Sequence, residues 1–475
     1  RKVTGLDLYA GSPEVMAVTR DAWQLMIETA DAHYEPGVFT TLVGYEWTSM
    51  PDGQNLHRNV IYRDTNVPDI PFTSLDSGNP EDLWDALDAQ RADGKIMMAI
   101  PHNSNVSNGL MYDRELFDGR PLTAEYAAQR LRNEPVSEIM QIKGTSETHP
   151  MLSPEDEFAD FELLTGQLSA SADESDPRGS YARDALRTGI EFSHTEGFNP
   201  YRFGVIGSSD SHNSSSSVEE SRHHGKLPLM DGTAGLRLGK SIFVPGSMHR
   251  TKNWGAAGLA GVWAQENTRE SIYDALERRE TFATSGPRIS LRFFGSFNYS
   301  AEMMQNPELL AQAYAGGVPM GGVLKAAADA EADNKAEAPA FALWVAKDPA
   351  GANLDRLQII KGWIDADGNS QEKVFDVALS DQRQPNANGN IPPVGNTVDV
   401  ASASYSNTIG AQQLQAFWSD PDFDPTREAF YYARALEIPT PRWSTFDAMR
   451  LGVEAPQPTS LQERAISSAI WYQPE

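Results

Sequence analysis

The chain has 475 residues, of which 40% are hydrophobic and 9% aromatic, which indicates a folded protein with one large and one smaller domain. Its net charge of −27, from 66 acidic and 39 basic residues, argues against nucleic acid and anionic membranes as main partners. The absence of cysteine excludes disulfides, thiolate nucleophiles and zinc–thiolate sites. No apolar stretch reaches the length of a membrane span.

The first two thirds of the chain show alternating strand and helix patterns. The spacing of apolar residues predicts a helix over Ala17–His33, and Pro80 with the acids after it predicts the start of a second helix. A later helix is expected to be capped by Asn267 or Thr268. Short apolar runs between the helices predict buried strands, in FTTLVGYEW, KIMMAIPHN, EIMQIKGTSETHP and FGVIGSSDSHN. This order predicts an α/β protein with a parallel sheet or barrel.

Each of these four runs is followed within a few residues by carboxylate or imidazole side chains. The residues concerned are Glu46, His102, Glu147, His149, Asp210 and His212. Active sites of parallel α/β folds are built at the C-terminal ends of the strands. A mixture of imidazole nitrogen and carboxylate oxygen suits divalent metal ions. The spacing of two residues in Asp210-Ser-His212 lets both side chains of an extended segment point the same way, so we expect two ligands presented together.

Other polar residues near these positions are candidates for contact with substrate, and His57, Arg58 and Lys143 each have an alternative role. His57, soon after Glu46, is predicted either to support the ligands or to contact substrate. Arg58 is expected either to pair with an anionic substrate or to be a surface arginine. Lys143 is expected either to face a phosphate group or to form a salt bridge with a neighbouring carboxylate. Asn103, next to His102, is assigned to substrate binding.

The last third of the chain has a different pattern. Apolar and polar residues alternate in FALWVAKD, LDRLQIIKGWID and EKVFDVALSD, and ADGNSQ between the last two predicts a hairpin. AFYYARALEI and SSAIWYQ predict further strands. We therefore expect a β-sandwich-like lobe over residues 296–475, packed on a barrel over residues 1–295.

The set GYEW, IPHN, SETHP and GSSDSHN resembles the PHP (polymerase and histidinol phosphatase) superfamily of metal-dependent phosphoesterases. Longer motifs resemble a related bacterial domain-of-unknown-function family, number 3604. They are GYEWTSMPDGQNLHRNVIYRD, IPHNSNVSNGLMY, QIKGTSETHPMLSPEDEF, VWAQENTRESIYDALERRETFATSGPRI and FYYARALEIPTPRWST. The resemblance implies a PHP-like distorted (β/α)7 barrel with two or three Mn, Zn or Fe ions, and a periplasmic or secreted location. By motif, the implied metal ligands are Glu46, His102, His149, Asp210 and His212.

One departure from the superfamily pattern concerns its first strand. PHP enzymes carry a His-x-His pair there, whereas the region before Glu46 contains only His33, within a predicted helix. The chain also begins at Arg1 and not with methionine. We therefore expect that the first barrel strands are missing from this chain. An N-terminal segment of the same gene product, or a neighbouring subunit, is the expected partner that completes the barrel.

Two function classes follow from the resemblance. The first is a metal-dependent hydrolase of phosphate esters, either a phosphomonoesterase or a phosphodiesterase, acting on a small anionic ester through metal-activated water. Its expected catalytic residues are Asp210, His212 and His57. The alternative is a non-catalytic binding or assembly protein that retains a PHP-like barrel. Metal content separates the two classes, because a hydrolase is expected to hold stoichiometric metal and to lose activity with a chelator.

Overall fold

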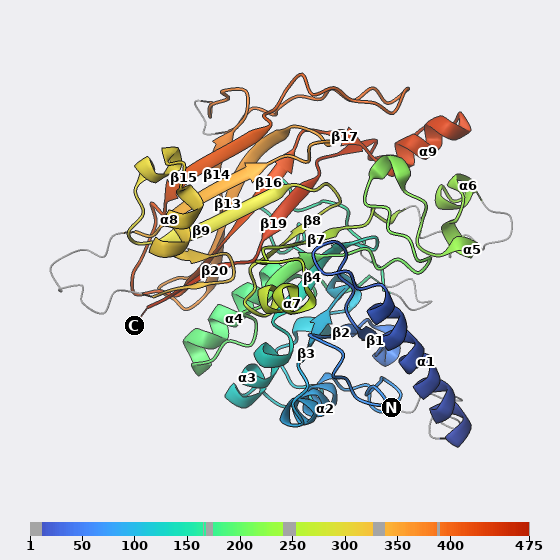
Figure 1. Ribbon diagram of the computed structural model, residues 1–475. Coiled ribbons are helices and arrows are strands. Elements are labelled where there is room, and N and C mark those ends of the chain that lie inside the picture. Colours follow the sequence, from blue (N-terminus) through green and yellow to red (C-terminus); the bar gives the residue numbers. More distant parts are fainter. Residues whose placement is uncertain are drawn as a thin grey trace. The chain divides into compact units, whose positions relative to one another are not determined.

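The computed structural model describes residues 12–164, 166–167, 174–240, 253–325, 338–386 and 390–474. The chain is a mixed α/β protein (Figure 1). Its contacts divide it into two compact units, each built from separate segments. Unit 1 comprises Arg1–Ser137, Thr165–Phe203 and Val262–Glu280, and unit 2 comprises Glu138–Leu164, Gly204–Gly261 and Thr281–Glu475. The domain boundary at residue 295 stays a prediction.

Unit 1 contains a three-stranded sheet in the order β1-β2-β3. Its strands are β1 (Gly44–Trp47), β2 (Arg58–Tyr62) and β3 (Met97–Pro101). The middle strand β2 is antiparallel to both neighbours, so the expectation of a parallel sheet is wrong for these strands. Because β2 runs in the opposite direction, its first residue lies beside the last residues of β1 and β3.

The described part of unit 1 contains the α-helices α1 (Pro13–Ala32), α2 (Pro80–Ala92), α3 (Ala124–Asn133), α4 (Ala182–Glu196) and α7 (Arg269–Glu277). The first helix confirms the pattern predicted over Ala17–His33, and α2 begins at the predicted Pro80. The side chain of Thr268 accepts a hydrogen bond from the backbone of Ser271, which confirms Thr268 as the cap of α7.

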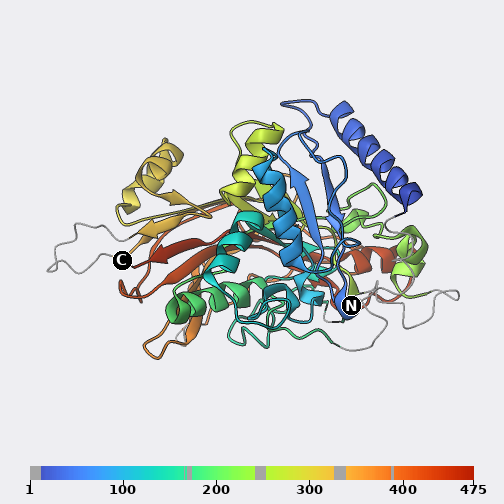
Figure 2. The same ribbon diagram turned by 90° about the horizontal axis from the view of Figure 1, so that it is seen from below.

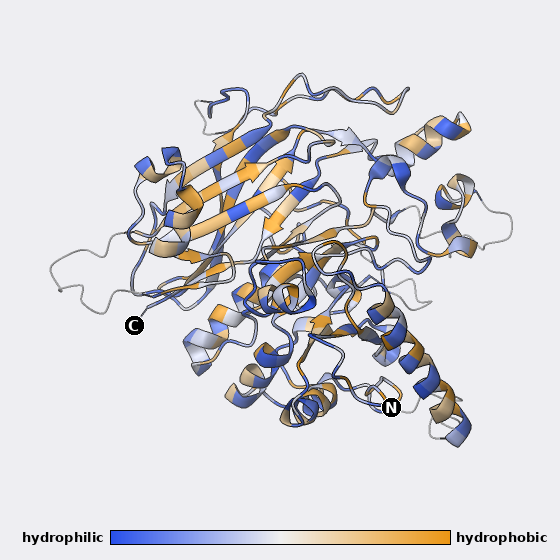
Figure 3. Cartoon of the chain, in the orientation of Figure 1, coloured by the Kyte–Doolittle hydropathy of each residue, from blue (hydrophilic) through white to orange (hydrophobic). Residues whose placement is uncertain are grey.

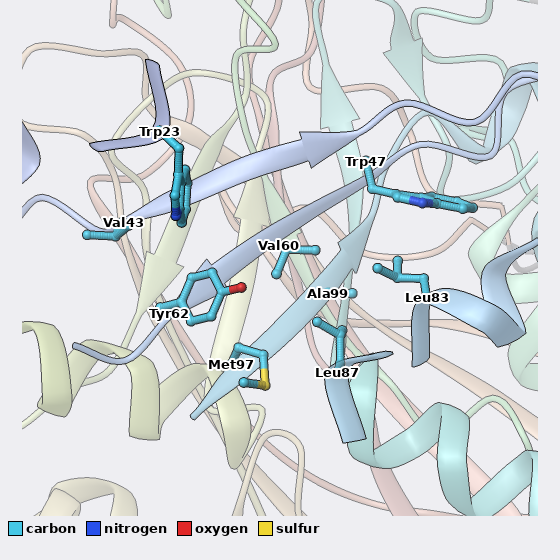
Figure 4. Close-up of a cluster of buried hydrophobic side chains, with 9 residues drawn as sticks. All are labelled: Trp23, Val43, Trp47, Val60, Tyr62, Leu83, Leu87, Met97 and Ala99. Atoms are coloured by element: carbon cyan, nitrogen blue, oxygen red, sulfur yellow. The ribbon is translucent and has the colours of Figure 1, made fainter. Parts of the chain in front are cut away.

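A compact hydrophobic cluster joins α1, α2 and the β1-β2-β3 sheet, as Figure 4 shows. Its buried members are Trp23, Val43, Trp47, Val60, Tyr62, Leu83, Leu87, Met97 and Ala99. Figure 3 shows that hydrophilic and hydrophobic residues are mixed along α1 and α2. Figure 2 shows the strands of this sheet, in blue, from a second side. The Trp23 ring lies 5.8 Å from Tyr45 and 6.1 Å from Tyr62, and its indole N–H donates to Pro68. This packing fixes the sheet that carries Glu46.

Unit 2 contains a second three-stranded sheet in the order β5-β4-β6. Its strands are β4 (Val136–Gln141), β5 (Gly144–Thr145) and β6 (Gly204–Gly207), and every residue of β4 and β6 is buried. The backbone N–H of Ser208, directly after β6, donates to the carbonyl of Met140 near the end of β4, 2.8 Å away. The C-terminal ends of β4 and β6 therefore lie side by side.

The remaining strands of unit 2 form two larger sheets and a short two-stranded one. One has the order β10-β9-β12-β15, with β9 (Ser290–Ser296), β10 (Val318–Pro319), β12 (Ala340–Ala346) and β15 (Gln413–Ser419). The other contains β7 (Leu259–Val262), β8 (Thr281–Thr284), β11 (Val323–Lys325), β13 (Leu354–Ile364), β14 (Ser370–Leu379), β16 (Ala429–Glu437), β19 (Arg464–Ser467) and β20 (Ile470–Gln473). The short sheet pairs β17 (Thr440–Pro441) with β18 (Ser460–Leu461). Short helices complete the unit: α5 (Pro228–Asp231), α6 (Ala234–Arg237), α8 (Leu309–Gly316) and α9 (Trp443–Leu451).

Aromatic side chains connect the two larger sheets. Phe341 on β12 lies 4.5 Å from Tyr431 on β16, measured between ring centroids, and Trp418 on β15 lies 4.8 Å from Phe375 on β14. Figure 3 shows hydrophobic stretches along these strands. The hairpin predicted at ADGNSQ is confirmed, because β13 and β14 pair antiparallel up to Ile364 opposite Ser370. The strands predicted in FALWVAKD, AFYYARALEI and SSAIWYQ are confirmed as β12, β16 and β20.

Strand pairing in the described part of the chain gives five separate sheets, and a closed barrel is not seen there. Within the same part, no helix combines the length and apolar character needed to cross a membrane.

A buried carboxyl in the β-rich part of unit 2 predicts a pH-dependent stability. Glu437 is only 1% exposed, and burial, helped by the negative charge of Asp348, raises its pKa to about 8. Because this pKa lies above the ordinary value of 4.5, folding favours the protonated form of Glu437. Its contribution to the free energy of unfolding is therefore fully present below pH 4.5 and is lost as the pH rises through 8.

We therefore expect the Glu437→Gln variant to unfold with a weaker pH dependence than the parent between pH 5 and 8. The difference in slope is at most about 1.4 kcal/mol per pH unit. Urea unfolding of both proteins at several pH values measures it. Parallel stability profiles for parent and variant would contradict this prediction.

Candidate metal centre

Three side chains of unit 1 bring metal-ligating atoms together. In the part of the chain that the structure describes, Glu46, His57 and His102 form the one group whose ligand atoms all lie within 4.8 Å of one another. One carboxylate oxygen of Glu46 is 2.7 Å from Nδ1 of His57 and 3.2 Å from Nε2 of His102. The two imidazole rings lie edge to face, with centroids 5.5 Å apart.

The sheet topology explains why these residues meet. Glu46 lies near the end of β1, His102 directly follows β3, and His57 directly precedes the antiparallel strand β2. The end of β1, the end of β3 and the start of β2 are therefore at the same edge of the sheet. The backbone N–H of His102 donates to the carbonyl of His57, 3.4 Å away, which extends this pairing by one residue. The pairing of β1, β2 and β3 therefore holds His57 and His102 beside Glu46.

The geometry fits a divalent metal ion. Ligand atoms about 2.1 Å from a common ion, at angles between roughly 90° and 110°, lie about 3.0 to 3.4 Å apart, and the 3.2 Å separation of Glu46 and His102 falls in this range. The 2.7 Å separation of Glu46 and His57 is a hydrogen-bond distance, so these two side chains must move apart by a few tenths of an ångström when an ion binds. The histidine side chains are 9% and 3% exposed, whereas that of Glu46 is 31% exposed, which leaves an approach from solvent. Burial alone would raise the pKa of the Glu46 carboxyl, but His102 and His57 outweigh it and hold this pKa well below its ordinary value.

In unit 2, Asp210 lies just beyond β6 and contacts two lysines. One carboxylate oxygen is 2.6 Å from Nζ of Lys143 and 2.5 Å from Nζ of Lys226. The salt bridge expected as one role of Lys143 is therefore present. Burial and the neighbouring Lys143 ammonium lower the pKa of Lys226 to about 8, against the attraction of Asp210. His212 is 46% exposed, and its Nδ1 lies 3.0 Å from the backbone oxygen of Asp210.

The segment after β4 holds two further predicted residues. Glu147 is buried, and one of its carboxylate oxygens accepts hydrogen bonds from the hydroxyl of Tyr432 and the guanidinium of Arg434. His149 is half-buried, and its Nδ1 accepts a hydrogen bond from the backbone N–H of Met151. The convergence of His149, Asp210 and His212 with Glu46 and His102 stays a prediction.

Comparison with known proteins gives one match. The model of a protein family of unknown function, DUF3604, matches residues 4–474. The chain belongs to the DUF3604 family. No curated protein and no solved structure matches it.

An asparagine that the motif analysis did not assign connects the two histidine segments of this DUF3604 protein. The amide nitrogen of Asn55 donates to the carbonyl of His102, 2.7 Å away, and more weakly to that of Asn103. Asn55 is fully buried and lies two residues before His57, so it ties the start of β2 to the end of β3. The one sequence feature that pointed to Asn55 was its position in GQNLHRN, two residues before His57.

Asn103, the predicted substrate contact, is fully buried and adopts the left-handed backbone conformation, with φ 53°. Among the described residues, neither atom of its side-chain amide has a hydrogen-bond partner. A buried amide without partners is costly unless a ligand or water satisfies it. Substrate binding by Asn103 stays a prediction.

Arg58 in the DUF3604 chain is 1% exposed, so the surface alternative for this residue is wrong. Its Nε donates to a carboxylate oxygen of Glu134, 2.9 Å away, and another guanidinium nitrogen donates to the carbonyl of Leu56. The indole N–H of Trp84 donates to the same Glu134 oxygen. These contacts hold Arg58 inside unit 1, at the first position of β2.

Proposed function

We propose that this DUF3604 protein is a metal-dependent hydrolase of phosphate esters, with Glu46, His57 and His102 as ligands of one divalent ion. The observation that carries the proposal is the meeting of two imidazoles and one carboxylate at one edge of the β1-β2-β3 sheet. Zinc hydrolases use such a set of two histidines and one glutamate and leave a further coordination position for water or substrate. Manganese and iron accept the same donor atoms.

The ligand residues differ in what they contribute. The two buried histidines fix the position of the centre, because their rings are enclosed by unit 1. Glu46 supplies the negative charge that balances the cation, and its partial exposure leaves room for an ester to approach. When bound, the ion would lower the pKa of a water molecule and polarise the phosphoryl oxygen. Asn55 holds the two histidine segments together.

The motif resemblance supports a wider proposal. We propose that the DUF3604 family is related to the PHP superfamily and that its first 295 residues correspond to a PHP-like barrel. In that case the family would bind two or three ions, and the motifs imply His149, Asp210 and His212 as further ligands.

The test is a measurement of metal content and of hydrolysis on the full chain. The protein is stripped of metal, reloaded separately with Mn²⁺, Zn²⁺ or Fe²⁺, and assayed with aryl phosphate monoesters and diesters. We expect about one bound ion per triad and a loss of hydrolysis of about 100-fold or more on metal removal, reversed by reloading.

Two results would contradict the proposal. Failure of all three metals to bind would exclude the centre itself. Stoichiometric metal without hydrolysis of either ester class would favour the non-catalytic binding or assembly protein.

A further inference from the structure

A partly open cavity of about 210 Å³ lies in unit 2, where the antiparallel strands β13 and β16 meet the loop after β15. The strand residues that line it lie opposite each other in pairs, Lys361 with Tyr431 and Trp363 with Ala429. Residues two apart on a strand point to the same face of a sheet, so these side chains share one face. Because the side chain of Ala429 is small, space remains beside the indole ring of Trp363.

Two half-buried aromatic rings border this cavity, those of Trp363 and Phe423. The Phe423 ring packs against Tyr472 and Phe297, with ring centroids 4.9 Å and 6.0 Å away, which fixes its position. The face of an aromatic ring carries partial negative charge and attracts C–H groups that neighbouring oxygen atoms polarise. The cavity therefore offers a surface on which a ring with C–H groups can stack.

The charged side chains of the cavity are balanced in pairs. Each cation lies beside one carboxylate, so the pairs add no net charge, and a charged ligand finds no unbalanced partner in them. A neutral polar ligand can still form hydrogen bonds to these ionised groups, and such bonds are stronger than those between neutral groups. The pairs, measured between nitrogen and oxygen, are Lys361–Asp420 at 2.6 Å, Arg427–Asp424 at 2.7 Å and Lys373–Asp422 at 2.6 Å.

The paired groups keep capacity for further hydrogen bonds. The ammonium group of Lys361 has three N–H donors, of which Asp420 and the carbonyl of Asp422, 2.8 Å away, use two. The guanidinium group of Arg427 has five, and its contacts with Asp424 and the carbonyl of Ile364 use two of them. The side chains of Arg427 and Asp422 are 30% and 53% exposed. A ligand in the cavity therefore meets both donors and acceptors.

The loop after β15 is held rigid by its own aspartates. Asp420 is fully buried and accepts hydrogen bonds from the hydroxyl of Tyr431, 2.7 Å away, and from the backbone N–H of Asp422, 3.0 Å away. Asp424 accepts from the backbone N–H and the hydroxyl of Thr426, at 2.9 Å and 2.7 Å. Because the polar groups of the cavity are already in place, a ligand would lose little affinity to ordering them.

We propose that this cavity binds one neutral sugar ring, stacked on Trp363 and hydrogen-bonded to Lys361, Arg427 and Asp422. The hydroxyl groups of a sugar both donate and accept hydrogen bonds, and its ring carries C–H groups beside oxygen atoms. The cavity is smaller than the roughly 300–1,000 Å³ of pockets for larger ligands, which suits a single ring. The cavity lies in unit 2 and the Glu46, His57 and His102 triad in unit 1, so the inference does not rest on the proposed function.

The experiment measures binding of glucose, galactose, mannose, xylose and N-acetylglucosamine to the full chain by ligand-observed NMR and titration calorimetry. The protein is first freed of metal, so that hydroxyl groups cannot bind through an ion at the triad. We expect saturable binding of at least one sugar, with a Kd in the millimolar range because so small a ligand makes few contacts.

The variants locate the binding. Trp363→Ala is expected to bind this sugar about 10-fold more weakly or worse, and Trp363→Phe, which keeps a ring, is expected to bind more tightly than Trp363→Ala. Asp422→Asn keeps the volume, removes a charged acceptor and is also expected to bind more weakly than the parent. Phe117→Ala is the control, because it removes a 46% exposed ring of unit 1 and is expected to bind like the parent.

Three outcomes would overturn the proposal. Failure of every sugar to bind the parent would do so without any variant, and parental affinity in a folded Trp363→Ala protein would do the same. Binding of zwitterionic amino acids or inorganic phosphate in place of the sugars would assign the cavity to a charged ligand.

Methyl glycosides of the sugar that binds distinguish its two sources. Equal binding of the glycoside supports recognition of a sugar at the end of a glycan, and loss of binding supports recognition of a free monosaccharide. Because the protein in these assays is free of metal, a failure of the proposed hydrolase function would leave the results unchanged.

Discussion

Replacing Glu46 with glutamine is expected to weaken binding of a divalent metal to the full chain by about 100-fold or more. The change keeps the volume of the side chain and removes the only carboxylate of the triad. Without it, the triad offers two imidazoles and no carboxylate charge that opposes the cation. Titration of the metal-free protein with Zn²⁺ or Mn²⁺, together with elemental analysis, measures this loss.

The controls for this prediction come from the same unit. Glu14→Gln changes an exposed glutamate in the first turn of α1 and is expected to leave metal affinity unchanged. His57→Asn is expected to reduce the affinity, whereas His194→Asn, on the exposed side of α4, is not. Equal metal affinity of Glu46→Gln and Glu14→Gln would show that the triad is not the metal centre.

The sequence predicted two of the three candidate ligands of the triad for a local reason. Glu46 and His102 each follow an apolar run, and a strand that ends in a polar side chain leaves a recognisable pattern. His57 was expected to support the ligands, to contact substrate or to act in catalysis, but not to be a ligand, because it follows no apolar run and no strand was predicted in the segment after it. That segment is β2, in which Arg58, Val60 and Tyr62 are buried in alternation. An alternating pattern headed by arginine was the signal for this strand.

Other features depend on contacts between distant parts of the chain, and local patterns do not contain them. Arg58 is buried because Glu134 lies beside it, although 76 positions separate the two residues. Lys226 lies in HHGKLP, which has no strand or helix pattern, and its buried ion pair with Asp210 is formed only in the folded chain. The hairpin of β13 and β14, by contrast, was predicted because its strands and its turn are adjacent in sequence.

Glu147 shows how one pattern covers two different roles. Like Glu46, it follows an apolar run, and the two are equivalent by spacing alone. In the structure Glu147 is 3% exposed and engaged by Arg434 and Tyr432, whereas the Glu46 side chain is 31% exposed and faces two histidines. A carboxylate after a strand therefore indicates either a ligand or a buried ion pair, and its partners decide between them.

The largest expected effect on stability concerns Arg434. Its side chain is fully buried in unit 2, and two guanidinium nitrogens donate to the two carboxylate oxygens of Asp156, at 2.9 Å and 2.7 Å. Its Nε donates to Gln358, and a further contact of 3.3 Å reaches Glu147. Replacing it with methionine leaves two buried carboxylates without this cation. Removing one partner of a buried ion pair costs about 3–5 kcal/mol, so we expect the free energy of unfolding to fall by that amount.

Urea unfolding at pH 7 measures this loss, and two comparisons interpret it. The exposed pair of Lys373 and Asp422 has side chains 50% and 53% exposed, so Lys373→Met is expected to cost no more than about 1 kcal/mol. The double variant Arg434→Met/Asp156→Leu removes one of the stranded charges with its partner and is expected to be more stable than Arg434→Met alone. Glu147 still keeps the hydroxyl of Tyr432 in that variant. If Arg434→Met unfolds like Lys373→Met, the buried arginine contributes no more than a surface ion pair, and the account of Glu147 as a residue held by Arg434 fails with it.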